Sequence, residues 1–158
     1  MNADNDDAII KWLRLSEESL TKISDIELAT LKIHIVIEDA LKFLLSKRLN
    51  ANEDALDDLR IEFSKLVEIA LAGINNPHLL GALRALNKAR NNISHRINST
   101  AVSEKLEVFV REIAYMQGVE PHWPSELSDQ IEILRKAFYE AGYAIFDFAI
   151  NSIPKNSA

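Results

Sequence analysis

The chain has 158 residues, of which 47% are hydrophobic and 27% charged, and its formal net charge is −6. This size and composition favour one globular domain, and the acidity argues against broad non-specific binding to duplex nucleic acid. The absence of cysteine excludes disulfides, thiolate zinc sites and cysteine nucleophiles. No apolar run is long enough to span a membrane and the acidic N-terminus does not resemble a signal peptide, so we expect a cytoplasmic protein without a membrane partner.

The spacing of apolar residues predicts an all-α protein. Hydrophobic positions recur every three or four residues, no alternating strand pattern is present, and glycine and proline occur only four times each. We expect a single-domain bundle of five to six helices over residues 1–158, with its core between about residues 24 and 150. Residues 153–158 are expected to form a frayed tail.

The first half of the chain contains three predicted helices. Residues 6–20 are amphipathic and are expected to pack on the outside of the core. Ser24 and Glu27 have the spacing of a capping box and predict the start of the second helix. Asn52 is the predicted cap of the third helix, which is expected to continue to Ala70.

The second half begins with Asn76-Pro77, a cap followed by a proline in the first turn, which is typical of a helix start. The following helix is expected to be capped by Ser99 or Thr100. The longest apolar stripe of the chain comes after a rigid connector that contains two prolines, and Ser125 is the predicted cap of that last helix.

Residues 69–103 contain no Asp or Glu, although the whole chain has 24 acidic residues. The basic residues of this segment are Arg84, Lys88, Arg90 and Arg96. A positive segment in an acidic chain is a natural place for an anion to bind, because opposite charges attract at short range. We therefore predict that Arg84, Lys88 and Arg96 contact phosphate groups.

Arg90 occupies a position where the apolar period of the helix after Asn76 calls for a hydrophobic residue. Burial of an unpaired guanidinium is costly, so we expect Arg90 to face a partner, a groove or a dimer seam. His95 lies about 7.5 Å further along the helix axis and roughly 140° around it. An imidazole exchanges a proton near neutral pH, a guanidinium can hold a phosphate, and Asn91 can orient the histidine or donate to a phosphate oxygen.

These groups suit metal-free cleavage of RNA, in which the ribose 2′-OH attacks the adjacent phosphorus and the 5′-oxygen leaves. The reaction needs a base for the nucleophile and an acid for the leaving group. One chain supplies one well-placed histidine, whereas two copies of this helix at a two-fold axis supply two, so a homodimer is expected. The reaction needs neither a metal ion nor a cofactor.

A resemblance to the HEPN superfamily rests on its Arg-polar-x-x-x-His signature, which is matched by Arg90-Asn91-Asn92-Ile93-Ser94-His95. Residues 86–91, which lead into the motif, and the earlier helical segment 33–42 are also similar to that family. The resemblance implies an α-helical bundle that dimerises with its motif helices in a shared cleft. Many members of the family are metal-independent endoribonucleases of toxin–antitoxin, phage-defence or RNA-processing systems.

The resemblance also implies roles for individual residues. Arg90 and His95 are the catalytic residues, with Asn91 beside them in the catalytic group, and Glu38 and Ser94 support them. RNA is then the substrate, and an antitoxin protein is a further partner that the family implies.

Two other functions are open at this point. The same fold could be catalytically silent and bind a nucleotide or an RNA end, or it could be a regulatory dimer in which Arg90 pairs with a carboxylate such as Glu38. His34 is expected to be structural because it lies between two isoleucines, and its i, i+4 pairing with Glu38 is too small a set for a metal site. His78, in the first turn of a helix, is expected to be solvated.

Overall fold

The computed structural model describes residues 3–95 and 98–151, and within them the protein is all-helical without a strand. This confirms the predicted fold class, while the number of helices, seven, exceeds the five to six predicted. No helix in these two ranges is long and apolar enough to span a membrane. The predicted frayed tail, residues 153–158, lies outside the described residues. The helices are α1 (Ala3–Leu20), α2 (Ile26–Leu49), α3 (Glu53–Asp58), α4 (Phe63–Ala70), α5 (Pro77–Ser94), α6 (Ser99–Gln117) and α7 (Leu127–Asn151).

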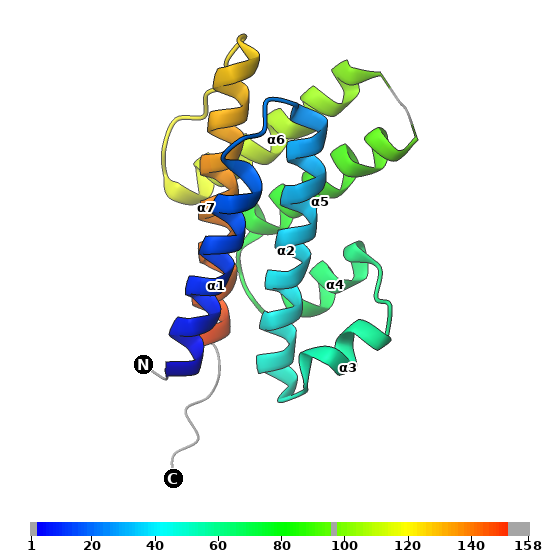
Figure 1. The fold of residues 1–158 in the computed structure, drawn as a ribbon, viewed down its shortest axis with the longest axis vertical. Helices are drawn as coiled ribbons and strands as arrows, with labels where there is room; N and C mark the ends of the chain where they lie inside the picture. The colour runs from blue at the N-terminus through cyan, green and yellow to red at the C-terminus, as the bar shows by residue number, and fades with distance from the viewer. Residues whose placement is uncertain (1–2, 96–97, 152–158) are drawn as a thin grey trace.

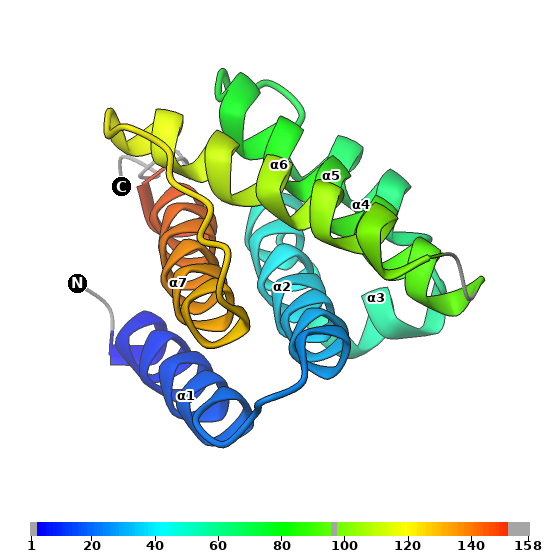
Figure 2. The ribbon, with the colours of Figure 1, turned by 90° about the horizontal axis from the view of Figure 1, so that it is seen from above.

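The helices form two groups that pack on each other (Figure 1, Figure 2). Helices α1, α2 and α7 run side by side along the long axis of the molecule. Helices α5 and α6 form an antiparallel pair that crosses α2 and α7, and the short helices α3 and α4 lie beside α2. Helix α5 thereby contacts α2, α4 and α6.

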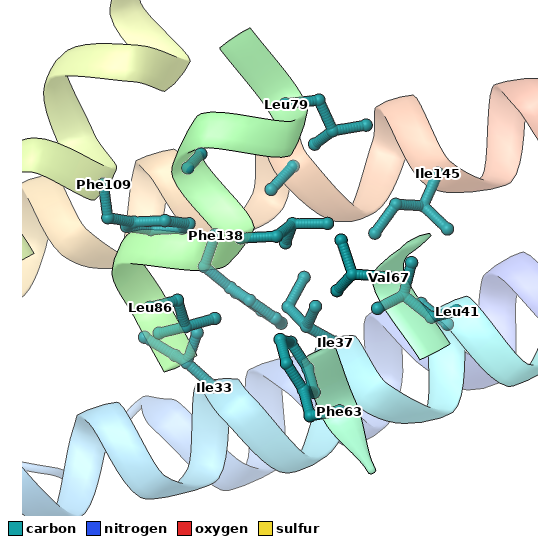
Figure 3. Close-up of a cluster of buried hydrophobic side chains, with 14 of the residues drawn as sticks. Ile33, Ile37, Leu41, Phe63, Val67, Leu79, Leu86, Phe109, Phe138 and Ile145 are labelled. Atoms are coloured by element: carbon teal, nitrogen blue, oxygen red, sulfur yellow. The ribbon is translucent and has the colours of Figure 1, made fainter. Parts of the chain in front are cut away.

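The core lies where α2, α4, α5, α6 and α7 meet (Figure 3). Each of these helices contributes apolar side chains that are almost completely buried, and removal of their surface from water provides the main stabilisation. Representative members are Ile37 from α2, Leu66 from α4, Leu86 from α5, Phe109 from α6 and Phe138 from α7. The apolar stripes of the sequence are therefore the faces that these helices turn toward the core.

Two helices begin with a different cap from the predicted one. Asp25, not Ser24, caps α2, and its side chain accepts from the third helical N–H at 2.7 Å. Asn98, not Ser99 or Thr100, caps α6, and its side chain accepts from the second helical N–H at 2.9 Å. In both places an Asx side chain adjoins the predicted hydroxyl and satisfies the exposed amides at the helix start in its place.

The other predicted starts in the second half fit the structure to different degrees. Asn76 is confirmed as the cap of α5, since its side chain accepts from the Leu79 N–H at 2.9 Å. Helix α7 begins at Leu127, and the Glu126 carbonyl accepts the first helical hydrogen bond. The start of this helix is therefore one residue later than the prediction from Ser125.

The predicted third helix is divided into two. Asn52 caps a helix as predicted, with its side chain accepting from the Asp54 N–H at 3.1 Å, but this helix is α3 and it ends at Asp58. Arg60 then has a φ of 46°, a left-handed conformation that cannot continue a right-handed helix. The chain starts again as α4 after Glu62, which brings the beginning of α4 next to α5.

Helix α1 lies outside α2 and α7, and one of its side chains reaches into the core. The Trp12 indole is 6% exposed and packs against Phe138 and Phe146, with ring centroids 5.1 and 5.3 Å apart. Its Nε1 donates to the Val36 carbonyl at 3.3 Å. Gly142 on α7 leaves the space for this ring, because a Cβ at that position would overlap the indole.

Gly142→Ala is therefore expected to lower the free energy of unfolding by about 1–3 kcal/mol, since overpacking forces the ring or the helices to shift. Gly81→Ala on α5 is the matched control, because its Cβ would meet only the flexible Glu112 side chain at 3.4 Å. The control should be neutral or stabilising, since alanine favours a helix more than glycine does. Urea denaturation followed by circular dichroism measures the free energy of unfolding of both variants. A Gly142→Ala variant as stable as the wild type would contradict the packing of Trp12 against Gly142.

Candidate functional site

The motif singled out in the sequence lies at the C-terminal end of α5. Arg90, Asn91 and Ser94 belong to its last turns, and His95 is the residue that caps the helix. The His95 N–H donates to the Asn91 carbonyl at 3.0 Å, and the Ser94 hydroxyl donates to the Arg90 carbonyl at 3.1 Å. The motif is therefore held in helical geometry up to its last residue.

A groove of about 410 Å³ opens beside this end of α5, between α2 and the start of α4. Its volume falls in the range of small-molecule and cofactor sites. Its polar lining consists of His34 and Glu38 from α2, Glu62 and Ser64 at the start of α4, and Asn87, Arg90 and Asn91 from α5. A groove is one of the three environments predicted for Arg90.

Arg90 has an exposed side chain whose Nη1 donates to the Asn91 Oδ1 at 3.1 Å. Among the described residues it forms no ion pair with a carboxylate, and Glu38 is paired with Lys42 at 3.2 Å. The pairing of Arg90 with Glu38, which a purely regulatory dimer would use, is thus absent from this part of the chain. The guanidinium is available to an anion.

His34 forms a buried wall of the same groove. Its side chain is 6% exposed, its ring stacks on Phe63 at a centroid distance of 4.0 Å, and its Nε2 lies 3.3 Å from the Asn87 Oδ1. Burial lowers the pKa of His34 below 6.5, although the hydrogen bond with Asn87 and the charge of Glu38 act in the opposite direction. The ring is therefore neutral at pH 7, and because an amide oxygen only accepts, Nε2 carries the hydrogen.

His95 is exposed at the end of α5 and does not line the groove. Within the described residues its ring has no hydrogen bond and no ion pair. The structure of one chain thus brings together Arg90, Asn91 and Glu38, but it leaves His95 outside the groove that they share. Ser94 is also exposed and bonds only to its own helix.

Two of the basic residues predicted to contact phosphates lie four residues apart on α5, which places them on one side of the helix. Arg84 and Lys88 are exposed, and neither lines the groove beside Arg90. Arg96 lies outside the described residues. Arg84 and Lys88 therefore do not contribute to the groove, and their contact with phosphates stays a prediction.

The segment that lacks acids in the sequence meets carboxylates from other helices in the fold. Glu38 and Glu62 line the groove beside Arg90. At the other end of α5, the side chain of His78 is 44% exposed, in line with the prediction, and its Nδ1 also lies 2.8 Å from the Glu112 Oε2. The groove is consequently less positive than the sequence around Arg90 indicates.

The sequence did not predict that Glu62, Asn87 and His34 line a groove beside Arg90. Asn87 stands one turn before Arg90, and this helical spacing was the one signal that could have placed it on the same side. Glu62 has no such signal, because its position depends on the break between α3 and α4. Among the described residues, no group of three or more His, Cys, Asp or Glu side chains is placed to hold a metal ion.

Comparison of the chain with family models, with curated proteins and with solved structures finds no match. The function is therefore argued from the groove, the motif helix and the chemistry of their side chains.

The buried position of His34 predicts a pH dependence of stability. Because its pKa is lowered in the folded state, the unfolded chain takes up the proton more readily. The stabilisation should be complete above the ordinary pKa of 6.5 and should decrease as the pH falls toward the folded-state value. His34→Gln removes this titration, so its free energy of unfolding should fall less between about pH 7.5 and 5.5 than that of the wild type. Urea denaturation over this range measures the two slopes, and parallel slopes would show that His34 is not the group responsible.

Proposed function

We propose that this protein is a metal-independent endoribonuclease of the HEPN type. The observation that carries the proposal is the state of Arg90, an exposed guanidinium without an ion pair among the described residues, lining a groove large enough for a nucleotide. His95 follows on the same helix with an exposed imidazole. An anion-binding group next to a proton-transfer group is what the cleavage of a phosphodiester requires.

Each residue of the motif has a role in this chemistry. Arg90 holds the scissile phosphate through parallel hydrogen bonds and offsets the negative charge that develops on it. Asn91 accepts from the Arg90 guanidinium and so restricts its orientation, and the Ser94 hydroxyl bonds to the last turn that carries both. His95 takes the proton of the attacking 2′-OH or gives one to the leaving 5′-oxygen.

A homodimer joined along α5 is part of the proposal, because His95 does not line the groove of its own chain. A two-fold axis near the end of α5 would bring His95 of one copy toward Arg90 of the other, so that each of the two sites in the dimer combines one arginine with one histidine. Arg84 and Lys88, exposed on the same helix, would contact RNA phosphates beside the cleft. Action as a toxin or defence component with an antitoxin partner follows only from the family resemblance.

A catalytically silent module that binds RNA or a nucleotide is the second candidate. The position of His95 outside the groove favours it, since binding needs Arg90 and the groove alone.

The replacement His95→Ala should lower the rate of RNA cleavage by at least about a hundredfold, since a general acid or base contributes that much or more. The assay uses pure protein and structured RNA in EDTA, and the wild-type products should carry 2′,3′-cyclic phosphate ends. His122→Ala, at an exposed histidine in the connector before α7, is the control and should cleave like the wild type. Cleavage by His95→Ala at the wild-type rate would rule out the assignment, and absence of cleavage by every protein would favour the silent module.

A mixing experiment tests whether the site is shared between two copies. Arg90→Ala and His95→Ala should each be inactive alone, but a heterodimer of the two retains one site with an intact arginine and an intact histidine. After subunit exchange at equal concentrations, about a quarter of the wild-type activity should return, because half of the dimers are mixed and each has one of two sites. Analytical ultracentrifugation checks that dimers form. If the exchanged dimers show no cleavage activity, both residues of a site lie on one chain.

A further inference from the structure

The groove beside Arg90 is unsuited to a phosphate over most of its surface. Glu38 and Glu62 line it, against the single guanidinium of Arg90. His34 is neutral at pH 7, and Lys42, the partner of Glu38, is also bound by the Asp57 carboxylate at 2.7 Å. Two carboxylates repel an anion, so a phosphate can approach Arg90 but not the acidic part of the groove.

The acidic part contains the carboxylate of Glu62, which interacts with the charge of Lys65 but forms no ion pair with it. Glu62 precedes α4 as its cap residue, but its side chain makes no capping hydrogen bond, and within the described residues it has no ion pair. An ionised carboxylate accepts hydrogen bonds through both oxygens and donates none. This side of the groove therefore suits a neutral group that presents two adjacent N–H donors.

The neighbouring side chains add hydrogen-bond donors and a fixed, buried wall. The Asn87 Oδ1 accepts from the His34 Nε2, which leaves the amide nitrogen of Asn87 as a donor. The His34 ring, stacked on Phe63, is fixed in orientation by that contact and by Asn87.

Among the four RNA bases, guanine fits this arrangement of donors and acceptors. Its Watson–Crick edge presents N1–H and the N2 amino group side by side, which match the two oxygens of one carboxylate, and an O6 acceptor next to them. Adenine, cytosine and uracil each place an acceptor next to their donor on this edge, and that acceptor would face carboxylate oxygen and be repelled.

We propose that the groove binds a guanine base of the RNA, adjacent to the phosphate held by Arg90. Glu62 accepts from N1–H and the N2 amino group, and the Asn87 amide donates to O6. The inference deepens the proposed ribonuclease function and rests on it for RNA as the ligand. Such a subsite would make the protein selective for cleavage next to guanosine. Binding of the base can be measured without cleavage.

The experiment is a titration of the full-length wild-type protein with guanosine, adenosine, cytidine and uridine 3′-monophosphates, followed by calorimetry. Guanosine monophosphate should bind at least about tenfold more tightly than the other three, the discrimination that one bidentate contact with a base provides. Glu62→Gln should weaken the binding of guanosine monophosphate about tenfold, because an amide offers one acceptor in place of two. Its affinity should then equal that of the other three nucleotides. Arg90→Ala should weaken the binding of all four nucleotides by a similar factor, because this replacement removes only the contact with the phosphate.

Glu68→Gln is the control, since Glu68 is an exposed acid in α4, the helix that follows Glu62, and does not line the groove. It should bind all four nucleotides like the wild type. Equal affinity for the four nucleotides, unchanged guanosine preference in Glu62→Gln, or no binding of guanosine monophosphate at millimolar concentration would each overturn the guanine subsite.

The outcomes separate this inference from the proposed function. Cleavage of RNA without preference for guanosine would overturn the subsite and leave the ribonuclease standing. Preference for guanosine monophosphate that depends on Glu62, in a protein that does not cleave RNA, would support the subsite and reject the ribonuclease.

Discussion

The candidate site depends on the burial of one face of α5. Leu79, Leu83, Leu86 and Ala89 on this face are completely removed from solvent. They fix the rotation of the helix about its axis, because a turned helix would expose them and lose the free energy of their burial. Arg90 follows Ala89 directly and therefore emerges where the core meets the solvent. The same packing explains how an arginine occupies the apolar stripe: its backbone continues the buried face, while the guanidinium extends into the groove and stays hydrated.

The parts of this protein that the sequence predicted correctly are those set by local interactions. The all-α class follows from apolar spacing, and the start of α5 at Asn76 follows from a cap that acts on an amide three residues away. The choice of Asp25 over Ser24 could not be made in this way, since both residues can accept from the same amides and the backbone decides between them. The break at Arg60 was also hidden, because arginine rarely adopts a positive φ and the apolar pattern continues across it.

The site was predictable as a helix segment but not as a surface. Arg90, Asn91 and His95 could be assigned to one helix end from their spacing, yet the charges that face them come from other elements. Glu38 belongs to α2, and Glu62 belongs to a turn that exists only because α3 and α4 separate. A stretch without acids in the sequence therefore does not become a basic surface, since electrostatic interaction depends on distance in space. The result is a groove with one cationic position and an acidic interior, which can treat the phosphate and the base of a nucleotide differently.

His34 shares the groove with Arg90, which raises the question whether it could replace His95 as the proton-transfer group of a single chain. Its environment argues against this role. Burial disfavours the imidazolium form that an acid–base cycle must pass through, and Nε2 already bonds to Asn87. A group that must exchange protons with substrate needs a free nitrogen in contact with it, whereas the His34 ring is covered by Phe63. His34 is therefore better suited to shape the groove than to act in chemistry, and the proposed ribonuclease mechanism assigns proton transfer to His95. Because His95 lies outside the groove of its own chain, the proposed catalysis requires the association of two chains.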